Sequence, residues 1–189
     1  MTRWAWPAVA LALAVLAGAL WGADSARWDW QPALAASQPW RAWTGAGVHW
    51  SPTHLAMNLG ATALLAWLGW RAGAGPREAL AWALAWPLTQ LGLLLQPTLL
   101  HFGGLSGVLH AGVAVLIWRL LRSRDTRELA IGAGLAAGLL AKLLLEAPWR
   151  SATRAVEGWD FALAPGAHAS GALAGAAMAL LICGWTRHD

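Results

Sequence analysis

The charged residues leave long intervals of the chain with no Asp, Glu, Lys or Arg. Residues 79–118 form the longest such interval, and it holds enough residues for two membrane crossings. A helix of about 20 mostly apolar residues spans a hydrocarbon core about 30 Å thick. Only 12% of the 189 residues are charged, whereas soluble domains average about 25%. The pattern therefore favours an integral membrane protein over a soluble domain.

We predict an all-α, polytopic membrane protein in which residues 1–189 form one domain, a bundle of six transmembrane helices. The uncharged interval at 79–118 is divided by the Gln96-Pro97-Thr98 turn. The first apolar segment could be read as a signal peptide, but its length and the lack of a clear cleavage site favour a helix. The helices are expected at about residues 4–22, 54–71, 79–95, 105–121, 129–146 and 166–185.

The basic residues orient this bundle, because short loops rich in Lys and Arg stay in the cytoplasm. With the N-terminus inside, eight of the twelve arginines fall in inner segments and four in outer ones. Both termini are therefore expected in the cytoplasm. The basic residues lie between apolar runs instead of clustering on one face, which argues against a nucleic-acid partner. Many of the 16 tryptophans flank apolar runs, and this predicts anchoring at the membrane interface.

Several polar side chains lie in the outer halves of the expected spans, where polar groups are costly and often functional. Ser106 precedes Arg119 by 13 residues, which is about 20 Å of helix and too short to cross the core. Asn58 precedes Arg71 by the same number of residues. These groups are therefore predicted to meet in one layer on the outer side: His54, Asn58, Ser106, His110 and His168.

Ser106 and His168 are the candidate nucleophile and base, because a serine hydroxyl needs a neighbouring imidazole to take its proton. His54 and Asn58 share a helix face and, with the Ser106 backbone N–H, can donate hydrogen bonds to an oxyanion. Close helix contact is expected from a stripe of small residues on the last helix, namely Ala167, Gly171, Gly175 and Ala179.

With these motifs the sequence resembles the rhomboid intramembrane serine proteases over about residues 4–187. The resemblance is carried by Trp40-Arg41, His49, His54-Leu55-Ala56-Met57-Asn58, Gly104-Leu105-Ser106-Gly107 and Ala167-His168-Ala169-Ser170-Gly171. Within that family the chain looks most like the rhombosortases, because it is small and carries the run from Gly104 to His110. Many rhomboid proteases place a Tyr where His110 stands, so the His110 ring is expected to pack on His168 or hydrogen-bond to it.

The resemblance implies an endopeptidase of the bacterial inner membrane whose active site opens to the periplasm. Its substrates would be exported proteins that end in a Gly-Gly motif, an apolar helix and a basic tail. The enzyme would remove this tail with a Ser-His dyad, by hydrolysis or by transfer of the new C-terminus to a lipid amine. No metal or organic cofactor is implied. Gly104 beside the serine is a candidate substrate-binding residue.

Lys142 and Glu146 are spaced i, i+4 near the outer end of the fifth helix, in line with Gly134 and Gly138, and are expected to face protein. Two interpretations stand: a structural ion pair, or a contact to the substrate's new carboxylate or an incoming amine. His49 and His101 are expected to have structural roles. Alternative functions are a general rhomboid protease, a non-catalytic rhomboid-like protein and a His-based metal-binding membrane protein, although no HExxH motif is present.

Overall fold

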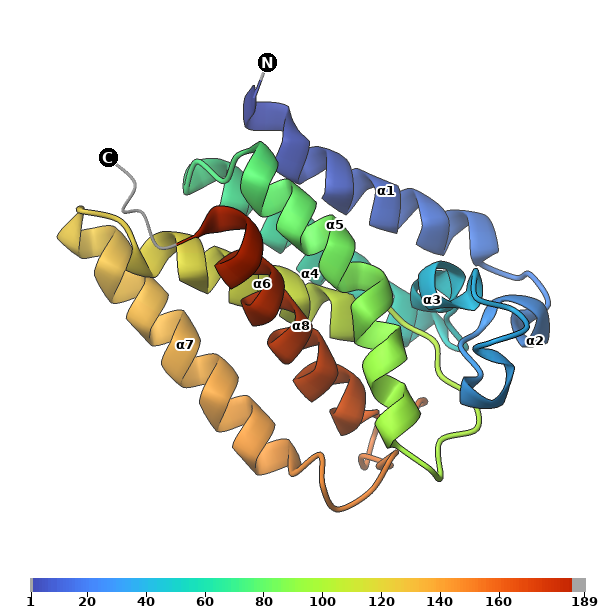
Figure 1. Cartoon of the computed structure of the whole chain (residues 1–189). Helices are drawn as coiled ribbons and strands as arrows, with labels where there is room; N and C mark the ends of the chain where they lie inside the picture. The colour runs from blue at the N-terminus through green and yellow to red at the C-terminus, as the bar shows by residue number, and fades with distance from the viewer. Residues whose placement is uncertain (1, 185–189) are drawn as a thin grey trace.

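The computed structural model of the chain describes residues 2–184, and their regular structure is helical (Figure 1). Two short helices, α2 (Ser25–Trp28) and α3 (Arg41–Thr44), lie between the first and second long helices. The long helices are α1 (Ala5–Leu20), α4 (Pro52–Arg71), α5 (Pro76–Leu91), α6 (Ser106–Leu121), α7 (Thr126–Glu146) and α8 (Pro165–Cys183).

The six long helices occupy the six segments expected from the apolar intervals. A 3-10 turn at Gly92–Leu95 continues α5 to the expected boundary, and Pro87 lies inside that helix. Residue 185, the expected end of the last helix, lies outside the described residues. Three segments are both long and apolar enough to cross a membrane: Pro76–Leu95, Thr126–Glu146 and Pro165–Cys183. Six crossings stay a prediction. Helices α1 and α6 have 16 residues each, about 24 Å of helix, and α4, although it has 20 residues, is not among the three.

Helix α6 occupies the middle of the bundle and packs most closely against α8 (Figure 1). A Cβ atom added at Gly171 would overlap the carbonyl oxygen of Gly107, and one at Gly175 would overlap that of Ala111. The expected small-residue stripe of α8 is buried along this contact. Backbone-to-backbone packing of this kind is how membrane helices approach closely when small residues line the contact. It brings the first turns of α6 and α8 together.

Three tryptophans belong to the core, so the prediction that the tryptophans act as interface anchors is wrong for them. Trp6, Trp30 and Trp82 are fully buried. The rings of Trp6 and Trp82 lie 4.4 Å apart, and their indole N–H groups donate to the carbonyls of Leu65 and Val108 at 3.0 and 2.8 Å. Tryptophan is buried without cost when its N–H has such a partner. Other tryptophans, such as Trp4 and Trp149, are exposed.

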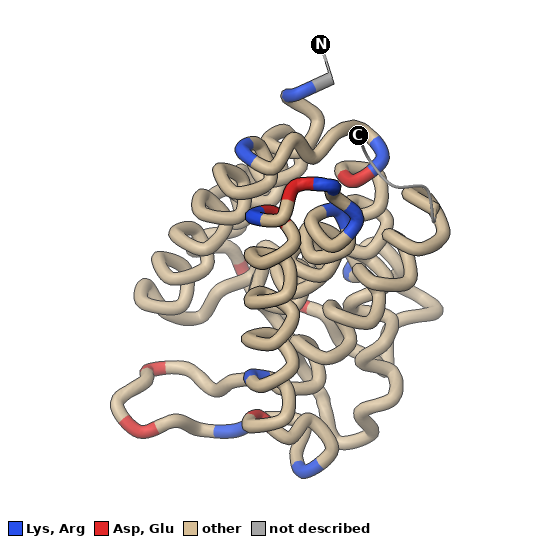
Figure 2. The backbone as a smooth tube through the Cα atoms, turned by 90° about the vertical axis from the view of Figure 1, so that its left-hand side faces the viewer, with Lys and Arg blue, Asp and Glu red and all other residues tan. Residues whose placement is uncertain are grey.

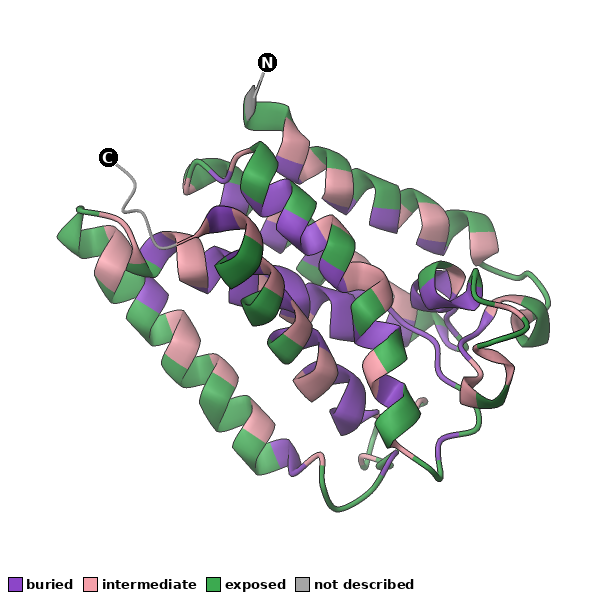
Figure 3. Cartoon of the chain, in the orientation of Figure 1, coloured by how far each residue is buried: buried purple, intermediate pink, exposed green. Residues whose placement is uncertain are grey.

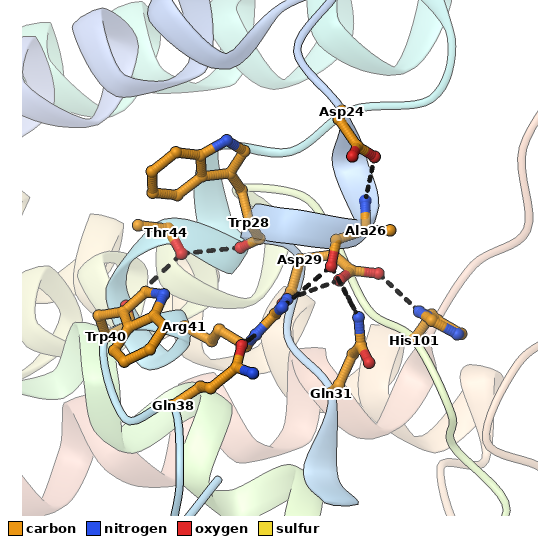
Figure 4. Close-up of polar contacts among 10 residues, drawn as sticks. All are labelled: Asp24, Ala26, Trp28, Asp29, Gln31, Gln38, Trp40, Arg41, Thr44 and His101. Atoms are coloured by element: carbon orange, nitrogen blue, oxygen red, sulfur yellow. Dashed lines mark hydrogen bonds and ion pairs between the residues drawn. The ribbon is translucent and has the colours of Figure 1, made fainter. Parts of the chain in front are cut away.

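The segment between α1 and α4 is folded around a buried ion pair. Arg41 donates from Nη1 to Asp29 Oδ1 at 3.1 Å and to the Asp29 carbonyl at 2.8 Å. Figure 4 shows Arg41 and His101 approaching Asp29 from different sides, and His101 Nδ1 lies 2.7 Å from Asp29 Oδ2. Trp30 and Phe102 exchange two backbone hydrogen bonds of 2.8 Å. These contacts tie the loop to the segment that leads into Ser106.

Helix α7 lies at the edge of the bundle and is mostly exposed (Figure 3). Only Gly132 and Glu146 are buried along its length. A Cβ atom at Gly134 or Gly138 would meet nothing within 4 Å. The expectation that this line of residues faces protein is therefore wrong for the two glycines and holds for Glu146, and Lys142, although exposed, contacts Glu146. Small residues permit close packing but do not require it.

Charged residues gather mainly toward the two ends of the bundle, with long uncharged stretches between them (Figure 2). The start of α1 and the end of α8 lie at one end (Figure 1). The first turns of α4, α6 and α8 and the last turn of α7 lie at the other, because α7 runs antiparallel to α6 and α8. Residues distant in sequence therefore meet at that end.

Candidate active site

Ser106 is the first residue of α6, and its side chain faces the first turn of α8. The Ser106 hydroxyl Oγ lies 3.0 Å from His168 Nε2, within hydrogen-bond reach. His168 is buried, whereas Ser106 is half-buried. As the first residue of the helix, Ser106 also has a backbone N–H with no acceptor within α6. The residue pair thus combines a hydroxyl, a ring nitrogen able to accept its proton, and a free backbone donor.

The other ring nitrogen of His168 contacts α7. Nδ1 lies 2.6 Å from Glu146 Oε2, and the second carboxylate oxygen of Glu146 accepts a hydrogen bond from Lys142 Nζ. The i, i+4 spacing predicts the contact between Lys142 and Glu146 but not the contact between Glu146 and His168. The sequence indicates only that Glu146 ends an expected span at the outer side, near the depth of His168. The contact itself depends on how α7 packs beside α8.

His110, one turn after Ser106, packs on His168 as the sequence predicts. The two ring centroids lie 4.3 Å apart, and the ring planes are inclined by 13°. His110 Nδ1 lies 2.6 Å from the Ser106 carbonyl oxygen. Because a carbonyl only accepts hydrogen bonds, Nδ1 carries the proton. The His110 ring is thus held by the backbone of α6 and covers one face of His168.

Asn58 is buried and held by His49. Its amide nitrogen Nδ2 donates to His49 Nε2 at 3.0 Å, while His49 Nδ1 donates to the Gly47 carbonyl at 3.1 Å. Burial lowers the pKa of His49 below its usual 6.5, an effect that the Gly47 carbonyl partly opposes. The neutral ring is therefore favoured, with Nε2 free to accept. The second N–H of the Asn58 amide stays available for another acceptor.

His54, one turn before Asn58, packs between a loop residue and a glycine. Its ring stacks on Phe161 with centroids 4.2 Å apart. A Cβ atom at Gly104 would lie 2.7 Å from His54 Cε1. Gly104 also has a φ of +128°, a backbone conformation that residues other than glycine rarely adopt. His54 Nδ1 is buried and has no hydrogen-bond partner among the described residues. Gly104 thus makes room for the His54 ring.

A cavity of about 630 Å³ joins these groups. Ser106, Asn58 and the imidazoles of His54, His110 and His168 line it together, in agreement with the predicted convergence in one layer. Of the three candidate substrate-binding residues, Lys142 lines the cavity, whereas Gly104 and Glu146 lie behind its wall. The rest of the lining is mainly apolar and includes Trp50, Met57, Leu64, Leu135, Trp159 and Phe161.

Metal-ligating side chains do not gather into a centre in the part of the chain that the structure describes. Across residues 2–184, no three His, Cys, Asp or Glu side chains are arranged to hold an ion. Cys183 is buried in α8. The His side chains of the site instead contact one another, the backbone, Asn58, Glu146 and Ser106.

A hydroxyl beside an imidazole, at the wall of a cavity among apolar helices, is an arrangement in which a serine can be activated as a nucleophile. A comparison with protein families matches residues 36–185 to the Rhomboid domain. The match covers most of the 189 residues, so the chain belongs to the rhomboid family, whose members are generally intramembrane serine proteases, although some are inactive. No curated protein matches the chain in sequence.

Proposed function

We propose that this protein is an active intramembrane serine endopeptidase in which Ser106 is the nucleophile. The observation that carries the proposal is the 3.0 Å contact between Ser106 Oγ and His168 Nε2 at the wall of the cavity. His168 takes the hydroxyl proton as Ser106 attacks the scissile carbonyl, then gives it to the leaving amine. Water or an amine then attacks the acyl-enzyme, again with His168 as the base.

The negative charge on the attacked carbonyl oxygen needs donors that are already in place. We assign this role to Asn58, His54 and the Ser106 backbone N–H. Asn58 is supported by its free amide hydrogen and by the contact that holds it to His49. His54 is supported by its position beside Asn58 in the cavity lining. Neutral imidazoles and an amide fit an apolar site, where an unpaired positive charge would be costly.

The substrates that we propose are exported bacterial proteins that end in a Gly-Gly motif, a membrane helix and a basic tail. Support comes from the rhombosortase-like run Gly104 to His110 and from the mainly apolar lining of the cavity. A Gly-Gly segment unwinds easily and brings its backbone close to the serine.

The proposed setting is the bacterial inner membrane, with six crossings, both termini in the cytoplasm and the cavity open to the periplasm. A lipid amine is the proposed acceptor where transfer replaces hydrolysis.

The deciding experiment is co-expression of the full chain with a membrane-anchored client that carries a Gly-Gly tail. The intact mass of the client is compared between wild type and Ser106→Ala, with Ser37→Ala as a matched control at an exposed serine far from the site. Wild type and the control should yield a client shortened near the Gly-Gly, and Ser106→Ala the full-length client. Equal masses in all three would overturn the proposed substrate class. A shortened client that is heavier than the product of hydrolysis by the mass of an amine would demonstrate transfer.

A second measurement tests the enzyme independently of the substrate. A fluorophosphonate probe phosphonylates an activated serine: Oγ bonds to phosphorus, fluoride leaves and the hydroxyl proton goes to the base. Purified wild type should be labelled at Ser106, and Ser106→Ala should not be labelled. Labelling without cleavage of the Gly-Gly client would favour a general rhomboid protease. No labelling of wild type would favour a non-catalytic member of the family.

A further inference from the structure

Glu146 occupies a position that stability alone disfavours. It is the last residue of α7, and the following Ala147 ends the helix with a φ of +48°. The C-terminal end of a helix carries partial negative charge, so a carboxylate there is repelled. Glu146 is also buried, although most of α7 is exposed. The free-energy cost of burying this carboxylate must be offset by its contacts. Those contacts are to His168 and Lys142.

We infer that Glu146 is a positioning residue that sets the tautomer and orientation of His168, so that the site is a Ser106–His168–Glu146 triad. The inference rests on the proposed function and deepens it. A carboxylate only accepts hydrogen bonds, so the 2.6 Å contact requires the proton on His168 Nδ1. The neutral ring then has its lone pair on Nε2, the nitrogen 3.0 Å from Ser106 Oγ. This is the tautomer that a general base needs.

The proton balance is simple. The Ser106 hydroxyl proton moves to His168 Nε2 as Oγ forms its bond to the substrate carbonyl carbon. Both ring nitrogens then carry protons, and the positive ring faces the Glu146 carboxylate through Nδ1–H. Glu146 gains no proton. The proton on Nε2 next passes to the leaving amine as the peptide bond breaks.

Lys142 contacts one of the two equivalent oxygens of the Glu146 carboxylate and leaves the other to His168. The Lys142 ammonium only donates hydrogen bonds, so it must meet an oxygen of residue 146. In Glu146→Gln the amide has one oxygen and one NH₂ group. With Lys142 present, the oxygen turns to the ammonium and the NH₂ turns to His168 Nδ1. The NH₂ needs an acceptor, so His168 shifts its proton to Nε2 and can no longer take one from Ser106.

In Glu146→Gln, Lys142 and His168 compete for the single amide oxygen. This competition predicts that the double variant Glu146→Gln with Lys142→Met is more active than Glu146→Gln alone. In Lys142→Met, Glu146 still accepts the Nδ1 proton, and the base keeps its tautomer. In Glu146→Gln with Lys142→Met, nothing draws the amide oxygen away, so it can turn to His168 Nδ1–H and restore the working tautomer. Removal of Lys142 should therefore partly rescue Glu146→Gln. An ion pair that only stabilises the fold would make the two single variants alike and leave the double variant no better.

The experiment measures the rate at which the fluorophosphonate probe labels Ser106 in the purified full chain, for wild type, the two single variants and the double variant. Glu146→Gln should be labelled at least about 100-fold more slowly, because a triad histidine in the wrong tautomer is a poor base. Lys142→Met should stay within about ten-fold of wild type, since one carboxylate oxygen still accepts the Nδ1 proton. The double variant should be labelled at least several-fold faster than Glu146→Gln.

Two further readouts separate positioning from structure. Nitrogen NMR of labelled histidine should show His168 protonated at Nδ1 in wild type and in the double variant, and at Nε2 in Glu146→Gln. Thermal unfolding of all four proteins controls for loss of fold. Equal labelling of Glu146→Gln and wild type, or a double variant no faster than Glu146→Gln, overturns the triad. Neither result touches the proposed function, which fails only if wild type is not labelled at Ser106 and does not cleave.

Discussion

Gly171 of α8 lies directly against the backbone of Gly107 on α6, with no space for a Cβ atom between them. Gly107 follows Ser106 in the chain, and Gly171 lies almost one turn after His168. The distance between the two helix backbones at this point therefore sets the distance between the hydroxyl and the imidazole. The site depends on the absence of two side chains as much as on the groups that react.

Substitution of Gly171 by Leu should force α6 and α8 apart and separate Ser106 from His168. Overpacking costs about 1–3 kcal/mol even where neighbouring side chains can move, and here the obstacle is backbone. We expect a lower melting temperature in detergent and loss of probe labelling at Ser106. Gly138→Leu is the matched control, because a Cβ atom at Gly138 meets nothing within 4 Å. Labelling of Gly171→Leu at the rate of the control would contradict this account.

Arg41→Ala should destabilise the fold through Asp29. Asp29 is 1% exposed, and without Arg41 its charge is left with hydrogen bonds from Gln31 and the His101 ring. Removal of one partner from a buried ion pair costs about 3–5 kcal/mol, and we expect the melting temperature to fall by about 6 °C or more. Arg27→Ala, at an exposed arginine of the same loop, should leave the melting temperature unchanged. Equal melting temperatures for the two variants would show that the pair contributes nothing.

The positions of the long helices and the meeting of Ser106 with His168 could be predicted because each rests on a local pattern. Uncharged intervals mark the helices, and the small residues on the last helix predict the close approach of α8 to α6. Helices that alternate in direction bring their first turns to the same end. These inferences need only the sequence, the length of a helix and the thickness of a membrane.

The contacts of individual side chains could not be predicted in the same way. Trp6 and Trp82 look like interface residues in sequence, and their burial depends on carbonyl partners on other helices. The contact between Glu146 and His168 depends on how α7 inclines toward α8, which no spacing within α7 reveals. Likewise, the role of His49 depends on the fold of the loop that carries it, because the loop places its ring against Asn58.

His49 should make stability depend on pH in a predictable direction. Burial lowers its pKa in the folded protein below the usual 6.5, so at acidic pH the unfolded chain binds the proton more readily. The contribution of neutral His49 to the free energy of unfolding is complete above pH 6.5. It is lost as the pH falls toward the pKa of His49 in the folded protein. Melting temperatures of wild type and His49→Gln should therefore converge between pH 7.5 and pH 5. The comparison isolates His49, because the other titrating groups are common to both proteins. A difference that stays constant with pH would refute the assignment.

His110 should act through its ring and not through its basicity. Its ring stacks on one face of His168 and is held there by its hydrogen bond to the Ser106 carbonyl. His110→Phe keeps an aromatic ring at the position, whereas His110→Ala removes it. Aromatic pairs contribute about 0.5–1.5 kcal/mol, so we expect His110→Ala to lower the rate of probe labelling by about three- to ten-fold and His110→Phe to lower it less. If Phe proved as damaging as Ala, the hydrogen bond to Ser106 would be the contact that matters. Full labelling of His110→Ala would remove His110 from the site, and His168 would then be held by Glu146 and its own helix alone.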